Sequence, residues 1–149
     1  MEAYRISSEK YANKLQASGA PNRWNKENQY VIYTSSARSL ATLEMVAHRN
    51  AIMGGLRYKM MVILIPDGED FIQELALSSL PKEWQTLKKY TLTQNIGSKW
   101  YEGNENLVLK VPSAIIPQEY NYIINTKHPK FSRVKLLSLE NYNWDKRLL

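Results

Sequence analysis

Short apolar stretches recur along the chain, and their composition predicts strands. Each has five to seven residues, most of them β-branched, aromatic or aliphatic, as is typical of strands. The stretches cover residues 30–34, 59–65, 107–111, 121–125 and 134–139. Pro66 and Pro112 end two of them, because proline has no amide hydrogen to donate to a neighbouring strand.

A different pattern follows the first predicted strand and indicates a helix. Ser35 and Ser36 offer an N-cap, and the helix is expected to run to about His48. Four residues share one face of this helix because their spacing is i, i+3, i+4 and i+7. They are Leu40, Leu43, Glu44 and Ala47. The pattern therefore places the Glu44 carboxylate on an otherwise apolar stripe.

The order of the elements predicts the fold class. Residues 91–101 predict a second helix or an irregular turn, broken near Gly97. Repeats, low-complexity stretches and linkers are absent from the sequence, so residues 1–149 are expected to form a single domain. Strands that alternate with few helices predict an α+β domain, with a central mixed or antiparallel sheet flanked by helices.

Composition excludes several kinds of chemistry. The chain of 149 residues contains no Cys, which rules out disulfides, Cys-ligated zinc, iron–sulfur clusters and thiol nucleophiles. Its longest apolar run, residues 60–65, is far shorter than the roughly 20 residues that span a bilayer. Residues 1–5 lack the basic and apolar segments of a signal peptide. A cytoplasmic protein without membrane contact is expected.

The net charge of +6 is unevenly distributed. Residues 1–60 and 126–149 are basic, whereas residues 61–125 are acidic. If the two basic ends meet in the fold, they would form an electropositive cleft for phosphates or an acidic partner. The alternative is that Lys and Arg only solvate the surface. There is no run of five like charges, so a basic tail for nucleic acid is not indicated.

Glu44 is the candidate for chemistry. A carboxylate that faces the interior is costly unless it is paired or borders a solvated cleft, so either an Arg partner or an active site is expected. His48 could join it in a metal pair, but two His residues and no HExxH motif argue against a metal site. Glycine-rich phosphate loops are missing as well. A bound nucleotide would therefore need side chains, above all Arg, to hold its phosphates.

A series of short motifs then follows in order along nearly the whole chain. They include Tyr4-Arg5-Ile6-Ser7, Arg23-Trp24-Asn25, Val31-Ile32-Tyr33-Thr34, Leu43-Glu44, Thr93-Gln94-Asn95-Ile96-Gly97, Val111-Pro112-Ser113-Ala114, Asn121-Tyr122 and His128-Pro129. Each motif is weak alone, but their joint order resembles the RES domain family, which is named for its Arg, Glu and Ser residues.

The resemblance implies an activity and a partner. Members of the family are toxins of toxin–antitoxin pairs with an Xre-like antitoxin. They degrade NAD+ by phosphorolysis or hydrolysis, and some transfer ADP-ribose to a protein. NAD+ would be the substrate, with inorganic phosphate as co-substrate in one route and no prosthetic group. The implied fold is similar to that of ADP-ribosyltransferases, with NAD+ in a cleft of the central sheet. The toxin would contact nucleic acid only through the antitoxin. The resemblance also allows a homodimer of the toxin within the toxin–antitoxin complex.

The resemblance also implies site residues. Arg23, Glu44 and Ser113 match the three residues that name the family, and Tyr33 and Arg5 match a tyrosine and an arginine of its cleft. Glu44 would stabilise positive charge on the ribose, because breaking a glycosidic bond builds such charge, or it would hold a ribose hydroxyl. The two arginines would bind the pyrophosphate or an incoming inorganic phosphate. Tyr33 would stack on nicotinamide, and Ser113 would hold the ribose.

Three points stay open at this stage. Asn121 and Asn125 flank a short predicted strand and could bind substrate, although Asn at strand ends also serves in turns. Pro21-Asn22 stands where the family has a glycine pair, which puts the shape of that loop in question. The competing functions are a mono-ADP-ribosyltransferase, an inactive antitoxin-binding domain and a basic nucleic-acid-binding module.

Overall fold

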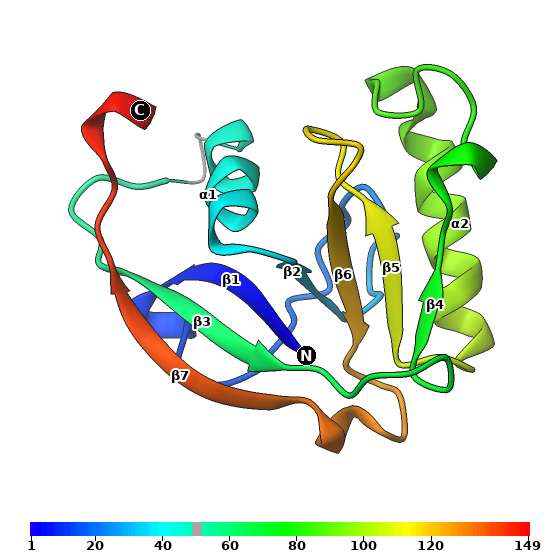
Figure 1. Ribbon diagram of the computed structural model, residues 1–149, viewed down its shortest axis with the longest axis horizontal. Helices are drawn as coiled ribbons and strands as arrows, with labels where there is room; N and C mark the ends of the chain where they lie inside the picture. Colours follow the sequence, from blue (N-terminus) through cyan, green and yellow to red (C-terminus); the bar gives the residue numbers. More distant parts are fainter. Residues whose placement is uncertain (49–51) are drawn as a thin grey trace.

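Seven strands form one sheet in the computed structural model, which describes residues 1–48 and 52–149 (Figure 1). In sheet order the strands are β4 (Ile72–Glu74), β5 (Val108–Pro112), β6 (Tyr120–Asn125), β2 (Val31–Ser35), β1 (Glu2–Ser8), β3 (Tyr58–Leu64) and β7 (Lys135–Tyr142). β4 and β5 run parallel, and the other neighbours are antiparallel. The predicted α+β class is confirmed.

The sheet is nearly divided between β1 and β2. β1 pairs with β3 along its full length, and β2 pairs with β6 along its full length. In contrast, β1 and β2 pair only through Tyr4 and Ser35. The sheet therefore consists of two halves, β4-β5-β6-β2 and β1-β3-β7. Helix α1 (Arg38–Ala47) stands over the junction between these halves (Figure 1).

Each helix covers its own part of the sheet. Helix α2 (Tyr90–Gly103) lies beside β4 and β5, where its Trp100 joins a core cluster (Figure 1). The other buried members of that cluster are Trp24, Val31, Trp84, Leu109, Val111 and Ile123. Helix α1 packs through Ala41 on Ile6 and Met60 of the second half. Helix α1 thus stands at the junction of β1 and β2, whereas α2 lies at the β4 end of the sheet (Figure 1).

The start of α1 corrects the prediction of its cap. Ala37 occupies the N-cap position and offers no side-chain hydrogen bond, and the helix begins at Arg38. Ser35 is the last residue of β2 instead, and its hydroxyl donates to the Asn121 side chain at 2.8 Å. Because Ser35 completes a strand and its side chain is engaged there, it cannot cap the helix. The helix ends at Ala47, one residue before the predicted end.

The predicted apolar stripe of α1 is only partly correct. Leu40 is buried, but Leu43 is 37% exposed and Ala47 is exposed. Ala41 is buried instead, so the inward face is rotated by one position from the predicted face. Glu44 is half-buried at the border of that inward face.

Helix α2 is continuous through Gly97, so the predicted break there is wrong. The glycine serves packing: a Cβ atom at this position would overlap the carbonyl oxygen of Trp24. The backbone of the loop that carries Trp24 therefore rests directly on the helix. Any larger residue at position 97 would push the two apart.

All five predicted strands are present, with ends shifted by a few residues, and two further strands were not predicted. One is β4, which has only three residues. The other is β1, in the middle of the sheet. Buried and exposed side chains do not alternate along it, because only Ala3 and Ile6 are buried. Its remaining residues are half-buried or exposed, which is unusual for a central strand and indicates an open space beside it.

Candidate active site

A cavity of about 330 Å³ lies at the junction of β1 and β2, beneath α1. It is lined from β1, β2, α1, β6 and the loop before β2. Its charged and polar lining includes Arg5, Arg23, Glu44, His48, Tyr90 and Asn121. We call it the Glu44 cavity. The incomplete pairing of β1 with β2 opens the space in which these side chains meet.

The Glu44 carboxylate is fixed by two hydrogen bonds from the other side of the cavity. Its Oε1 accepts from the Ser113 hydroxyl at 2.8 Å and from Asn121 Nδ2 at 2.7 Å. Asn121 is itself oriented, because its Oδ1 accepts from the Ser35 hydroxyl. No Lys, Arg or His nitrogen within residues 1–48 and 52–149 comes within 4.0 Å of the Glu44 carboxylate oxygens, and His48 Nδ1 instead lies 3.0 Å from the Glu44 backbone carbonyl oxygen. Of the two expectations for Glu44, the described residues therefore support a solvated cleft and show no ion pair.

Ser113 contacts Glu44 and does not line the cavity itself. It is fully buried, directly after β5, and its Oγ accepts from the backbone N–H groups of Ile115 and Ile116, both at 3.1 Å. These two bonds use the acceptor capacity of the hydroxyl and leave its proton for Glu44. Its neighbour Ala114, and not Ser113, is among the lining residues of the cavity. The geometry thus differs from the expected direct contact between Ser113 and the ribose.

Two arginines bring positive charge to the cavity without a carboxylate partner in the described part of the chain. Arg5 crosses from β1 to β2, where its Nη1 donates to the Tyr33 carbonyl oxygen at 3.0 Å. Burial of this guanidinium lowers the pKa of Arg5 below its ordinary value. The Nη1 of Arg23 is buried and has no hydrogen-bond partner among the described residues. Both cations are thus poised for an anion.

Tyr33 contributes its ring to the cavity and its hydroxyl to the loop of Arg23. The hydroxyl donates to Asn25 Oδ1 at 2.6 Å and accepts from the Trp24 backbone N–H at 3.0 Å. Burial raises the pKa of Tyr33 above its ordinary value, so the phenol stays neutral. Because the hydroxyl is engaged, only the ring face is left for a ligand.

The loop before β2 has Pro21-Asn22 in place of the glycine pair of the family, and hydrogen bonds hold its shape. Neither Pro21 nor Asn22 has a positive φ, so no glycine is required at either position. The Asn22 side chain accepts from the Arg23 backbone N–H at 2.8 Å and from the Tyr90 hydroxyl at 3.1 Å. Gln94 Nε2 donates to the carbonyl oxygens of Asn22 and Asn25. Helix α2 therefore fixes the loop.

The remaining predicted residue, Asn125, lies away from the Glu44 cavity. It ends β6, where its Nδ2 donates to Asn104 Oδ1 and its Oδ1 accepts from the Lys127 backbone N–H. It serves the turn that follows the strand. Sequence reasoning missed Asn22 and Tyr90 as lining residues. Tyr90 opens α2, and its ring lies 5.5 Å from the Arg23 guanidinium, a contact that no sequence motif signals.

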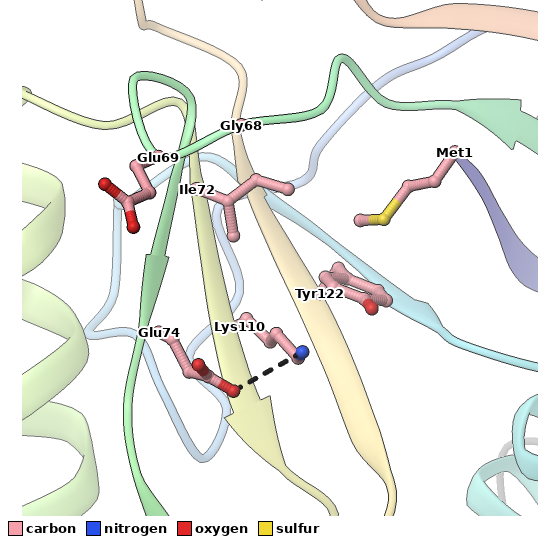
Figure 2. Close-up of a pocket in the computed structure, with 7 residues that line it drawn as sticks. All are labelled: Met1, Gly68, Glu69, Ile72, Glu74, Lys110 and Tyr122. Atoms are coloured by element: carbon pink, nitrogen blue, oxygen red, sulfur yellow. Dashed lines mark ion pairs between the residues drawn. The ribbon is translucent and has the colours of Figure 1, made fainter.

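A hollow of about 450 Å³ lies over β4, β5 and β6 (Figure 2). Because consecutive residues of a strand point to opposite faces, Tyr122 lines this hollow whereas Asn121 lines the Glu44 cavity. Lys110 and Glu74 point toward one another here and form an ion pair at 3.4 Å (Figure 2). We call it the Lys110 hollow.

The described residues contain neither a metal-binding cluster nor a membrane-spanning helix. Residues 1–48 and 52–149 contain no group of three or more His, Cys, Asp or Glu side chains suited to a metal ion. The helices within these ranges are all too short or too polar to cross a bilayer.

The fold is shared with a solved toxin structure. A chain of the crystal structure of the M. tuberculosis MbcT–MbcA toxin–antitoxin complex superposes with a TM-score of 0.75 at 13% sequence identity. The match covers 95% of this chain and 84% of that one. The two proteins therefore have the same α+β architecture.

The sequence comparisons define the family more closely. The chain belongs to the RES domain family, whose model matches residues 2–145, so the resemblance seen in the motifs is confirmed. It is 33% identical over 145 residues to the Prs ADP-ribosylating toxin of Sphingobium sp. (strain YBL2), covering 93% of this chain and 88% of that protein. It is 30% identical over 154 residues to Toxin Res of Photorhabdus laumondii, covering 100% of this chain and 97% of that protein. These relatives place the chain among the toxins of the family.

Proposed function

We propose that this protein is the toxin of a toxin–antitoxin pair and that it depletes NAD+ by cleaving the bond between nicotinamide and ribose. The observation that carries the proposal is the Glu44 cavity itself. It holds one fixed carboxylate, and it holds two arginines that lack a carboxylate partner in the described part of the chain. NAD+ carries the complementary charges, since its nicotinamide ring is positive and its pyrophosphate is negative.

Glu44 would stabilise the transition state. As the bond between the ribose C1 atom and the nicotinamide nitrogen breaks, its electron pair neutralises the pyridinium ring and positive charge develops on the ribose. A carboxylate that is already oriented stabilises this charge without reorganising. Ser113 and Asn121 supply that orientation from the end of β5 and the start of β6. In this proposal Ser113 is a positioning residue.

Arg5 and Arg23 would bind the pyrophosphate or an incoming inorganic phosphate. Guanidinium groups suit this task because they remain charged and donate two hydrogen bonds in parallel. The Arg23 Nη1 that finds no partner among the described residues is such a donor. The Tyr33 ring, with its hydroxyl already engaged, would stack on nicotinamide.

Two nucleophiles are compatible with this site. In phosphorolysis an oxygen of hydrogen phosphate bonds to C1 of the ribose, giving nicotinamide and ADP-ribose-1″-phosphate. In hydrolysis the oxygen of water forms that bond, and its proton leaves to solvent with ADP-ribose as product. A protein side chain as acceptor is the second candidate function. The Sphingobium relative, named an ADP-ribosylating toxin, favours it.

An antitoxin would block this cavity in the cell, because free NAD+ cleavage harms the host. We infer an Xre-like partner that places an acidic segment or its C-terminus against Arg5 and Arg23, where opposite charge would steer it. The shared fold with a chain of the MbcT–MbcA complex supports a protein partner. A complex that leaves both arginines open to solvent would contradict this mode of inhibition.

The deciding experiment is incubation of the purified protein with NAD+, with and without inorganic phosphate, followed by chromatography of the products. ADP-ribose-1″-phosphate that forms only with phosphate indicates phosphorolysis, and free ADP-ribose indicates hydrolysis. Label from the adenine moiety of NAD+ that stays on an added cell-extract protein indicates transfer. The Glu44→Gln variant is the matched control. Intact NAD+ under all conditions, with folded protein, would overturn the proposed function.

A further inference from the structure

A second cavity, of about 570 Å³, adjoins the Glu44 cavity and is not lined by α1. Its walls come from the strands β1, β2 and β3 and from the segment 11–22, which follows β1. We call it the rear cavity. Arg5, Asn22 and Tyr33 line both cavities, so the two spaces adjoin at these residues, where Arg5 crosses from β1 to β2.

The charge of the rear cavity has one sign. Arg5 and Lys14 are among its lining residues, and no Asp or Glu of the described chain is. Neither cation takes part in an ion pair within residues 1–48 and 52–149. Arg5 uses one of its five N–H groups on the Tyr33 carbonyl oxygen, which leaves others for an anion. Such a lining suits a phosphate-bearing ligand.

The rest of the lining suits a nucleoside. Ile32 and Met61 add apolar side chains to the lining, and Tyr11, which is 53% exposed, adds an aromatic ring that has Lys10 Nζ 5.4 Å from its centre. Gln16 is held at the rim, because its Nε2 donates to the Tyr11 carbonyl oxygen at 3.2 Å. Inorganic phosphate would gain nothing from these apolar and aromatic walls.

The volumes of the two cavities also favour a nucleotide in the rear cavity. The Glu44 cavity, at about 330 Å³, lies at the lower end of the range for small-molecule sites. A dinucleotide consists of two nucleotides of similar size, and only one of them carries the bond that Glu44 acts on. The second nucleotide needs a further space that is reached past a phosphate-binding group. The rear cavity adjoins the Glu44 cavity and shares Arg5 with it, which meets both conditions.

We propose that the rear cavity binds the adenylate half of the dinucleotide, with the base near Tyr11, the phosphate chain at Arg5 and Lys14 at the rim. This inference rests on the proposed function, because it assumes that the substrate is a dinucleotide. It assigns a binding role to the segment 11–22, which contributes nothing to the positioning of Glu44.

The test compares two substrates that share the same scissile bond. Nicotinamide mononucleotide has the nicotinamide riboside and one phosphate but lacks the adenylate half. Lys14→Gln removes the rim cation, and Lys14 is exposed, so the variant is expected to fold. Its KM for NAD+ should rise about fivefold, the upper scale of one exposed charge contact. Its KM for nicotinamide mononucleotide and its kcat for both substrates should stay unchanged. Lys82→Gln is the matched control, because Lys82 is exposed and lines none of the three cavities.

A binding measurement separates failure of this inference from failure of the proposed function. Titration calorimetry with AMP alone should show binding to the wild type and to Glu44→Gln, and weaker binding to Lys14→Gln. AMP binding with this pattern would support the rear cavity even if no NAD+ were cleaved. NAD+ cleavage with equal KM values in wild type and Lys14→Gln would overturn the inference while the proposed function stands. A change confined to the KM for inorganic phosphate would also overturn it.

Discussion

The Glu44 cavity and the Lys110 hollow both lie against strand β6, but their charged side chains are paired differently. In the hollow, Lys110 and Glu74 pair directly across β4 and β5 (Figure 2). In the cavity, Glu44 is bound by neutral donors, and the arginines face the same space without a carboxylate partner in the described part of the chain. Paired charges satisfy each other. Charges of opposite sign that are kept apart in a solvated cavity remain available to a ligand that carries both.

The largest effect is expected from Glu44→Gln. The amide keeps the shape of the side chain but cannot stabilise developing positive charge, so NAD+ turnover should fall about 100-fold or more. The melting temperature should hold, because no cation of the described residues loses a partner. Turnover and melting are measured on the same sample. If Glu44 belonged to a buried ion pair, the substitution would instead lower the free energy of unfolding by about 3–5 kcal/mol. A stability loss of this size, with full activity in the folded fraction, would contradict the contrast between the cavity and the hollow.

The next effect is expected from Arg23→Gln. Removal of one charge-assisted contact to phosphate, worth about 1.5–3 kcal/mol, should lower kcat/KM for NAD+ about 10- to 100-fold. Stability should stay level or rise, since a buried Nη1 that lacks a partner in the described chain disappears. Arg133→Gln is the control, because Arg133 is exposed and lies on Phe71, outside the cavity. Equal losses of kcat/KM in both variants would show that the lower net charge of the protein, and not a contact of Arg23, causes the effect.

A smaller effect on activity is expected from Ser113→Ala. Without the hydroxyl, Glu44 keeps only the bond from Asn121, so kcat should fall about tenfold while the KM for NAD+ stays unchanged. Stability should fall by about 1–3 kcal/mol, because two backbone N–H groups lose their acceptor. Steady-state kinetics with correction for the folded fraction separates the two effects. A raised KM with normal kcat would instead indicate direct contact with substrate.

The smallest effect is expected in the hollow. Lys110→Gln breaks the pair with Glu74, and partly exposed pairs of this kind contribute about 0–1 kcal/mol. Activity should remain within about twofold of wild type, because the side chain lies on the opposite face of the sheet from Glu44. A kinetic assay and a melting curve check both points. A strong loss of turnover would mean that the hollow takes part in function and that the contrast with the cavity is false.

The sequence predicted the buried strands well because their composition alone identifies them. It missed β1 because a central strand that borders a cavity has few buried residues to show. It singled out Glu44 through an apolar stripe that is only partly real, since Leu43 and Ala47 are exposed. Glu44 nevertheless lines the cavity, because one side of α1 faces it.

The partners of Glu44 could not be paired with it by any local pattern. Ser113 and Asn121 meet at one oxygen atom because β5 and β6 pair with Val111 opposite Asn121, a register that only the folded sheet defines. Tyr90 and Asn22 likewise meet across α2 and the loop before β2. The motif resemblance supplied Ser113, but its contact with Glu44 comes from the structure.

The long separation of Glu44 from its partners along the chain has a consequence for synthesis. The two bonds that fix its carboxylate span 69 and 77 residues. Glu44 therefore has neither partner until the ribosome has added most of the chain and β5 and β6 have emerged to pair. Contacts of such separation also form slowly. A growing chain thus passes most of its synthesis without the two hydrogen bonds that orient the Glu44 carboxylate.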